Sequence, residues 1–235
     1  MTAEISIPLF LILLIGIPHG AGDILIARRI FQTNYFKLTL FLTSYLIIAS
    51  LSATIWFFMP LFSLTLFLLI SISHFGLMDT EKTKTLPFRY LRAMIYGSTP
   101  IIIPATFHTA DVAALFSLLI FEEHTFLANY IANIFPIWLL SCVIFFLSGE
   151  KTLKHQFVEI LLLAIILAYL PPLWGFVIYF CLIHSSRHTR ELLNSLGSLN
   201  YNDCVFLILT ILLSISSILI MAFHFATDTF DIGII

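Results

Sequence analysis

Four histidines lie in strongly apolar stretches of the sequence, where an ionisable side chain is costly and therefore suggests a function. They are His19, His74, His184 and His188. His184 and His188 are four residues apart, which places both imidazoles on one face of a helix with Cβ atoms about 5–6 Å apart. Two imidazoles need this spacing to bind a single metal ion. We therefore expect the four side chains to form one metal site.

The positions of these histidines within their apolar stretches indicate a shared depth. At a rise of about 1.5 Å per residue, His19 lies about 14 Å before Arg28 and His74 about 12 Å before Lys82. The other two are interleaved with arginines. All four therefore belong to the half of the membrane nearest the basic residues. We expect ordinary exposure to water for the remaining histidines, which are His108, His124, His155 and His224.

Acidic residues follow two of the four histidines at short spacing. A metal held by neutral imidazoles keeps its positive charge, which favours nearby carboxylates in a low-dielectric site. Asp23 is four residues after His19, so on a helix it faces the same way and could accept a hydrogen bond from that imidazole. Asp79 is five residues after His74, about 140° away around a regular helix. We therefore expect Asp79 to contact another ligand or to cap the helix.

The residue types also restrict the chemistry. Imidazole suits zinc, copper, nickel and iron alike. Four ligands would complete the tetrahedron of zinc, whereas on iron(II) they would leave about two of six positions open for dioxygen or substrate. The sequence has no glycine-rich phosphate loop and no Ser with a base partner, so phosphoryl transfer and hydrolysis are unsupported.

Aromatic residues are abundant, with 24 Phe, 8 Tyr and 3 Trp. Most will face lipid or neighbouring helices, but a Phe-lined cleft is what an extended apolar substrate would require. By proximity to the histidines, Phe75 and Tyr179 are the candidates for lining such a cleft. The residues alone thus favour an oxidative metal site that acts on a lipophilic molecule.

The elements that must position these residues are membrane-spanning helices. Of 235 residues, 60% are hydrophobic and only 10% are charged, whereas soluble domains are about 25% charged. At about 20 apolar residues per span, the chain can cross a bilayer about seven or eight times. We expect a single integral-membrane domain over residues 1–235, an all-α polytopic helical bundle. The apolar runs fall at about residues 5–26, 37–58, 61–79, 90–106, 126–147, 156–170, 173–192 and 203–225.

The placement of basic residues gives the expected orientation, because Lys and Arg collect in short cytoplasmic loops. With eight spans and the N-terminus outside, all 11 Lys and Arg, Arg92 among them, fall in inward loops. The segment 110–121 is too short to span and is expected to be interfacial or re-entrant. We therefore predict a multi-pass protein of the cytoplasmic (inner) membrane with both termini outside and the metal site in the cytoplasmic half.

Three short motifs contain the four histidines: Pro18-His19-Gly20-x-x-Asp23, His74-Phe75-Gly76-x-x-Asp79 and His184-Ser185-x-Arg187-His188. In order, spacing and membrane context, they resemble the histidine signatures of the Brp/Blh family of membrane β-carotene dioxygenases, over essentially the whole chain. The resemblance implies a non-haem Fe(2+) enzyme that splits the central double bond of β-carotene with O2 to give two retinal molecules, usually for a microbial rhodopsin. It also implies that His19, His74, His184 and His188 are the iron ligands and that Asp23 and Asp79 support them.

Three other functions use some of the same residues. A haem protein would bind its iron axially through two imidazoles and would show a Soret band. A metal-ion or proton transporter would use the histidines as relay points, but the outer half of the membrane offers few polar residues for a pathway. A non-catalytic carrier of carotenoids or retinoids would bind pigment without consuming it. No basic stripe with interleaved aromatics suggests nucleic acid as a partner.

Overall fold

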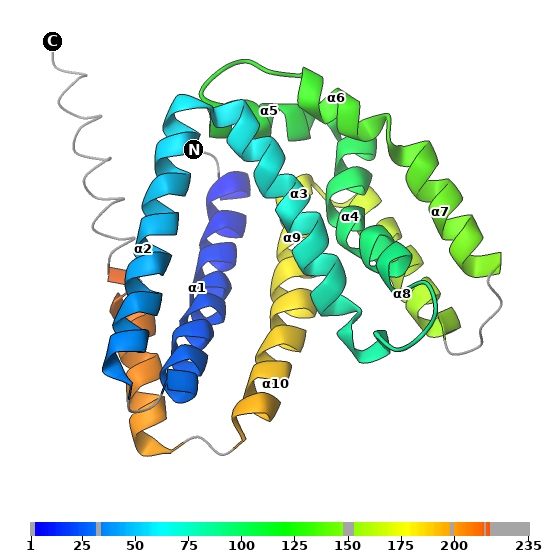
Figure 1. Ribbon diagram of the computed structural model, residues 1–235. Coiled ribbons are helices and arrows are strands. Elements are labelled where there is room, and N and C mark those ends of the chain that lie inside the picture. The colour runs from blue at the N-terminus through cyan, green and yellow to red at the C-terminus, as the bar shows by residue number, and fades with distance from the viewer. Residues whose placement is uncertain (1–2, 32–33, 148–152, 198–199, 214, 217–235) are drawn as a thin grey trace, which may run out of the picture. The chain divides into compact units, whose positions relative to one another are not determined.

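The computed structural model describes the chain except residues 1–2, 32–33, 148–152, 198–199, 214 and 217–235, and the side chains of residues 3, 17–21 and 23–24. The described residues form helices and contain no strand (Figure 1). The predicted all-α class is therefore confirmed. The helices are α1 (Ala3–Phe31), α2 (Tyr35–Phe58), α3 (Pro60–Asp79), α4 (Arg89–Phe107), α5 (Thr109–Ile120), α6 (Phe126–Ala132), α7 (Phe135–Leu147), α8 (Lys154–Tyr169), α9 (Pro172–Val177), the π-helix η3 (Ile178–His184) and α10 (Ser185–Leu196), with a 3-10 turn, η1, at Glu81–Thr83. A further apolar helix follows α10 at Tyr201–Leu213.

Three helical segments among the described residues are long and apolar enough to cross a membrane. They are Tyr35–Phe58, Pro60–Asp79 and Phe126–Leu147, the last of which combines α6 and α7. A fourth crossing is formed if α4 and α5 count as one span, although these two helices are bent by 111° at His108. That bend makes α5 a separate helix in the segment expected to be interfacial or re-entrant. The eight crossings and the outer position of the termini stay predictions.

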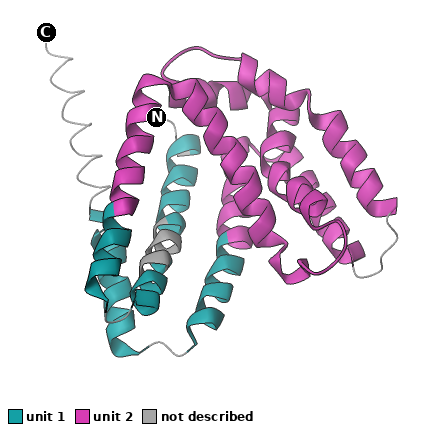
Figure 2. Ribbon diagram, in the orientation of Figure 1, with its two compact units in different colours: residues 1–43, 185–235 teal, residues 44–184 magenta. Residues whose placement is uncertain are grey.

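The chain divides into two compact units, coloured separately in Figure 2. Unit 1 contains residues 1–43 and 185–235, and unit 2 contains residues 44–184. In unit 1, α1 packs against α10. Arg29, at the end of α1, donates hydrogen bonds to the carbonyl of Leu196 and to the carboxylate of Asp203, the latter at 2.5 Å. These bonds join α1 to the end of α10 and to the helical segment that follows it.

Helix α4 is the centre of unit 2, because it packs against α3, α5, α6, α7, α8 and α9. Its contact with α3 is a close approach of two backbones. A Cβ on Gly76 would lie 1.9 Å from the carbonyl oxygen of Ala93, and a Cβ on Gly97 would lie 1.9 Å from that of Ile72. Small residues allow helices in membranes to pack this closely. The contact therefore fixes the end of α3 against α4.

The connection between α3 and α4 is organised around Arg92, whose side chain is fully buried in α4. Its Nε donates to the carbonyl of Pro87, and its two terminal nitrogens donate to Thr83, at both the hydroxyl and the carbonyl, to the carbonyl of Leu86 and to the amide of Gln156. A guanidinium has five N–H donors, and here there are five acceptors. Arg92 was expected in a loop and is instead a buried residue that holds the loop in place.

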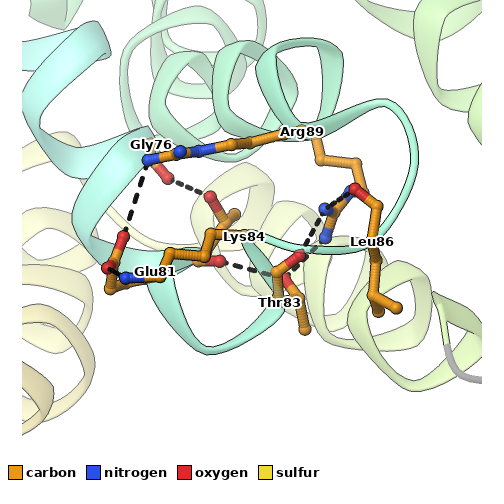
Figure 3. Close-up of polar contacts among 8 residues, drawn as sticks. Gly76, Glu81, Thr83, Lys84, Leu86 and Arg89 are labelled. Atoms are coloured by element: carbon orange, nitrogen blue, oxygen red, sulfur yellow. Dashed lines mark hydrogen bonds and ion pairs between the residues drawn. The ribbon is translucent and has the colours of Figure 1, made fainter.

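Shorter-range contacts complete this connection, and Figure 3 shows them together. The hydroxyl of Thr80 donates to the carbonyl of Gly76 at 2.7 Å and so caps the last turn of α3. Glu81 forms exposed ion pairs with Lys84 at 2.5 Å and with Arg89 at 3.6 Å. The capped turn ends on Asp79, so the bond from Thr80 helps to hold the backbone of that residue.

Candidate functional site

The helix that carries His184 changes its winding immediately before that residue. Ile178–His184 is a π-helix, η3, which follows α9. In a π-helix the backbone hydrogen bonds run from residue i to i+5, so residues five apart lie close to one above the other. In an α-helix the same two residues are about 140° apart. The change of winding brings Tyr179 and His184 to the same side of η3.

Asp79, the last residue of α3, is the group that both of these side chains contact. The hydroxyl of Tyr179 donates to Oδ2 of Asp79 at 2.7 Å. Nδ1 of His184 lies 3.3 Å from each carboxylate oxygen. The side chains of His184 and Asp79 are 0% and 1% exposed, so this carboxylate depends on protein donors. Asp79 thus contacts His184, one of the predicted ligands outside its own motif, and its role in supporting a metal stays a prediction.

The contact with Asp79 selects one nitrogen of His184 for metal binding. A carboxylate acceptor at Nδ1 favours the tautomer with the proton on Nδ1, which leaves the lone pair on Nε2. Nε2 is buried. Metal-binding histidines commonly donate their other N–H to a carboxylate, which orients the ring and raises its basicity. The donor set around His184 therefore fits a metal ligand.

His74 is the second predicted ligand that unit 2 places at this site. Its ring lies on α3, with its centroid 5.3 Å from that of His184 and the two planes at 67°. Two imidazoles from different helices therefore come together, as the four-histidine hypothesis requires. Among the side chains that the structure describes, no group of three or more His, Cys, Asp and Glu is close enough to hold a metal ion.

The other predicted site residues belong to unit 1. His19 and Asp23 lie on α1, and their side chains are outside the described residues. His188 is half-buried on α10. The convergence of all four imidazoles and the role of Asp23 stay predictions.

Aromatic rings enclose the imidazole of His184 on two sides. Phe75 approaches it edge-on, with ring centroids 4.7 Å apart, and Phe180 stacks on it at 5.9 Å and 21°. Phe176 in turn stacks on Phe180 at 5.4 Å. Phe75 also meets Tyr179 edge-on at 5.3 Å. Both residues predicted to line the substrate thus lie at this site, and their contact with substrate stays a prediction.

Sequence reasoning missed what the Tyr179 hydroxyl does. The side chain is fully buried, and its hydroxyl is bonded to Asp79. The five-residue spacing between Tyr179 and His184 gave no signal for this contact. On a regular helix that spacing places the two residues on different faces, and only the π-helix aligns them.

A separate apolar cavity of about 370 Å³ lies between α3, α4, α6 and α7. Leu68 and Ile72 of α3 and Trp138 of α7 are among its lining residues. His74 follows Ile72 by two residues, about 200° further around α3. The cavity and the histidine pair therefore lie on different sides of that helix.

Comparisons with known proteins match the chain to one enzyme family. The sequence model of a family described as "Beta-carotene 15,15'-dioxygenase" matches residues 10–229. A curated relative from an uncultured marine bacterium, 66A03, named "Beta-carotene 15,15'-dioxygenase", is 31% identical over 184 residues, which are 77% of this chain and 66% of the relative. The match thus spans just under two thirds of the relative's length. No solved structure matches the chain.

Proposed function

Because the chain belongs to the β-carotene 15,15'-dioxygenase family, we propose that it cleaves the central double bond of β-carotene with dioxygen to give two molecules of retinal. In this reaction the bond between the two central carbons breaks, and each carbon gains one oxygen atom as an aldehyde. The observation that carries the proposal is the buried contact of Asp79 with His184, beside His74 and among aromatic rings. This arrangement suits a metal that acts on an apolar substrate.

The cofactor in this proposal is iron(II), with His19, His74, His184 and His188 as its ligands. The tautomer selected at His184 supports it, because the nitrogen away from Asp79 carries the lone pair. Activation of dioxygen is the chemistry that bound iron(II) would supply, since four imidazoles leave about two coordination positions open.

The protein's own residues then have three tasks. Asp79 holds the proton on Nδ1 of His184 and keeps the ring in one orientation. Phe75 and Phe180 flank that ring and keep water away from it. The aromatic faces could also stabilise positive charge that develops on the polyene.

The setting of the reaction is the cytoplasmic membrane. The apolar helices support it, because a substrate dissolved in lipid can reach an intramembrane site without crossing water. The retinal produced would be available to a retinal-binding protein in the same membrane, such as a microbial rhodopsin.

Expression of the chain in a bacterium that makes β-carotene tests the function. Retinal is measured by chromatography for the wild-type chain and for His19→Ala, His184→Ala and His155→Ala. His155 is exposed and serves as the control. We expect retinal from the wild type and from His155→Ala, and loss of retinal in the other two variants. Unchanged β-carotene with the wild type would contradict the function, and normal cleavage by His184→Ala would contradict the proposed site.

A further inference from the structure

We propose that the π-helix η3 aligns Tyr179 with His184 so that both side chains contact Asp79. Tyr179 is then a positioning residue, which acts through Asp79 to determine which nitrogen of His184 binds the metal. Tyr179 and His184 both contact the same carboxylate, although they are five residues apart on one helix. Regular α-helical winding would separate them by about 140°. The single π-helical segment in the described chain therefore occurs where these two contacts require it.

The two contacts to Asp79 differ in quality. The bond from Tyr179 is short, at 2.7 Å, whereas Nδ1 of His184 is 3.3 Å from both oxygens. Hydrogen bonds weaken with distance, so the tyrosine bond is the stronger constraint on the carboxylate. The terminal torsion of an aspartate is otherwise broad. Tyr179 thus sets the orientation of the carboxylate, and the imidazole of His184 responds to it.

The neighbouring residues fix the rest of this contact, so the terminal torsion of the Asp79 side chain is its main remaining degree of freedom. Thr80 caps the turn that ends on Asp79, and Gly76 is pressed against the backbone of α4. At the other end, the ring of Tyr179 is fully buried and meets Phe75 edge-on. Both the backbone of Asp79 and the hydroxyl of Tyr179 therefore have defined positions.

A loss of alignment between Tyr179 and His184 follows if one residue is inserted into η3. Leu182 lies in the middle of this segment and is 65% exposed, so its side chain contributes little packing. Insertion of one alanine after Leu182 would place Tyr179 and His184 six residues apart, which is about 120° around an α-helix, so the two side chains would no longer share a side. Leu182→Ala changes the same position and keeps the register, so it is the matched control.

The direct test is ¹⁵N NMR of the His184 ring in metal-free protein in alkaline buffer, where a histidine is neutral. In the wild type and in Leu182→Ala we expect the tautomer with the proton on Nδ1. In Tyr179→Phe and in the alanine insertion we expect a mixture of tautomers. The same tautomer fraction in all four proteins would overturn the inference. If the insertion variant does not fold, Tyr179→Phe decides the outcome alone.

Metal affinity gives a second readout, and this part rests on the proposed function. Removal of a group that supports a metal ligand typically weakens metal binding about 10–100-fold. When Tyr179→Phe competes with a chelator for iron(II), its affinity for iron(II) should therefore be about 10-fold lower than that of the wild type. If Tyr179→Phe has an unchanged His184 tautomer while the wild type forms retinal, the positioning role of Tyr179 is refuted and the proposed function stands. The expected tautomer shift with no iron binding in the wild type would refute the proposed metal and leave the positioning role supported.

Discussion

Unit 2 buries two charged side chains near the connection between α3 and α4, and their hydrogen bonds differ in kind. Arg92 directs its five N–H donors to neutral acceptors, most of them in one loop. Asp79 instead accepts hydrogen bonds from a hydroxyl and from an imidazole on a different helix. The first arrangement holds backbone in place, and the second orients a side chain that has another nitrogen left for chemistry.

This difference shows that burial of an ionisable group does not by itself indicate function. Both side chains are at most 1% exposed. What separates them is the identity of their partners. Carbonyl groups only accept hydrogen bonds, whereas an imidazole that donates from one nitrogen keeps the lone pair on its other nitrogen, which can bind a metal. We therefore expect substitutions at Arg92 to affect stability and substitutions at Asp79 to affect the chemistry.

The largest effect is expected for Arg92→Met. The substitution leaves the buried amide of Gln156 and three partly buried carbonyl groups without these donors. Each unsatisfied acceptor costs up to about 1–3 kcal/mol. The protein in detergent should therefore melt at a much lower temperature. Arg89→Met is the control, because the contacts of Arg89 are an exposed ion pair with Glu81, worth about 0–1 kcal/mol, and a position over the ring of Tyr90. Equal melting temperatures for the two variants would contradict the structural role of Arg92.

Asp79→Asn is the complementary change, since it keeps the shape of the side chain and removes its charge. Retinal formation per folded protein should fall about 10–100-fold. The amide keeps only one, weaker acceptor oxygen, which Tyr179 and His184 would have to share, so the tautomer of His184 is less well fixed. Gln156→Leu is the matched control, because it removes an acceptor from Arg92 and should lower stability without a change in specific activity. The comparison fails if both variants lose activity to the same extent.

Gly97→Ala should disturb both groups together. Its Cβ would lie 1.9 Å from the carbonyl oxygen of Ile72, so α3 and α4 must separate. Overpacking of this kind costs about 1–3 kcal/mol, and the end of α3 would move with it. Gly175→Ala is the control, because its Cβ would meet a flexible side-chain atom of Leu167 at 2.9 Å. Thermal melting and retinal assays should show losses in Gly97→Ala that Gly175→Ala lacks.

The smallest effect is expected for Glu81→Gln. Its ion pairs with Lys84 and Arg89 are exposed, so their loss should cost less than about 1 kcal/mol. Melting curves in low and high salt check this expectation. A decrease comparable to that of Arg92→Met would show that the loop depends on its surface charges.

The apolar runs of the sequence predicted helix positions well, because charge and proline mark where an apolar helix can end. The run predicted at 61–79 corresponds to α3 at Pro60–Asp79, with proline at its start. Hydropathy did not reveal the break between α6 and α7 or the π-helix inside the run at 173–192. Both are changes in winding within continuously apolar sequence, so composition carries no signal for them.

The site was predicted to the extent that helical phase determines it. The 140° between His74 and Asp79 indicated a contact elsewhere, and that contact is with His184. The bond of Tyr179 was missed because it depends on the π-helix. His108 was expected to be exposed to water, but its Nε2 is 2.9 Å from the carbonyl of Ala168 and its side chain is 22% exposed. Long-range partners of this kind require the packed structure.

X-ray absorption at the iron edge, measured on the purified protein, tests the proposed centre most directly. The four-histidine site predicts bound iron with about four imidazole ligands, no sulfur ligand and no porphyrin. Loss of one imidazole is expected in His184→Ala. Protein that cleaves β-carotene without iron, or with iron held in a porphyrin, would contradict it.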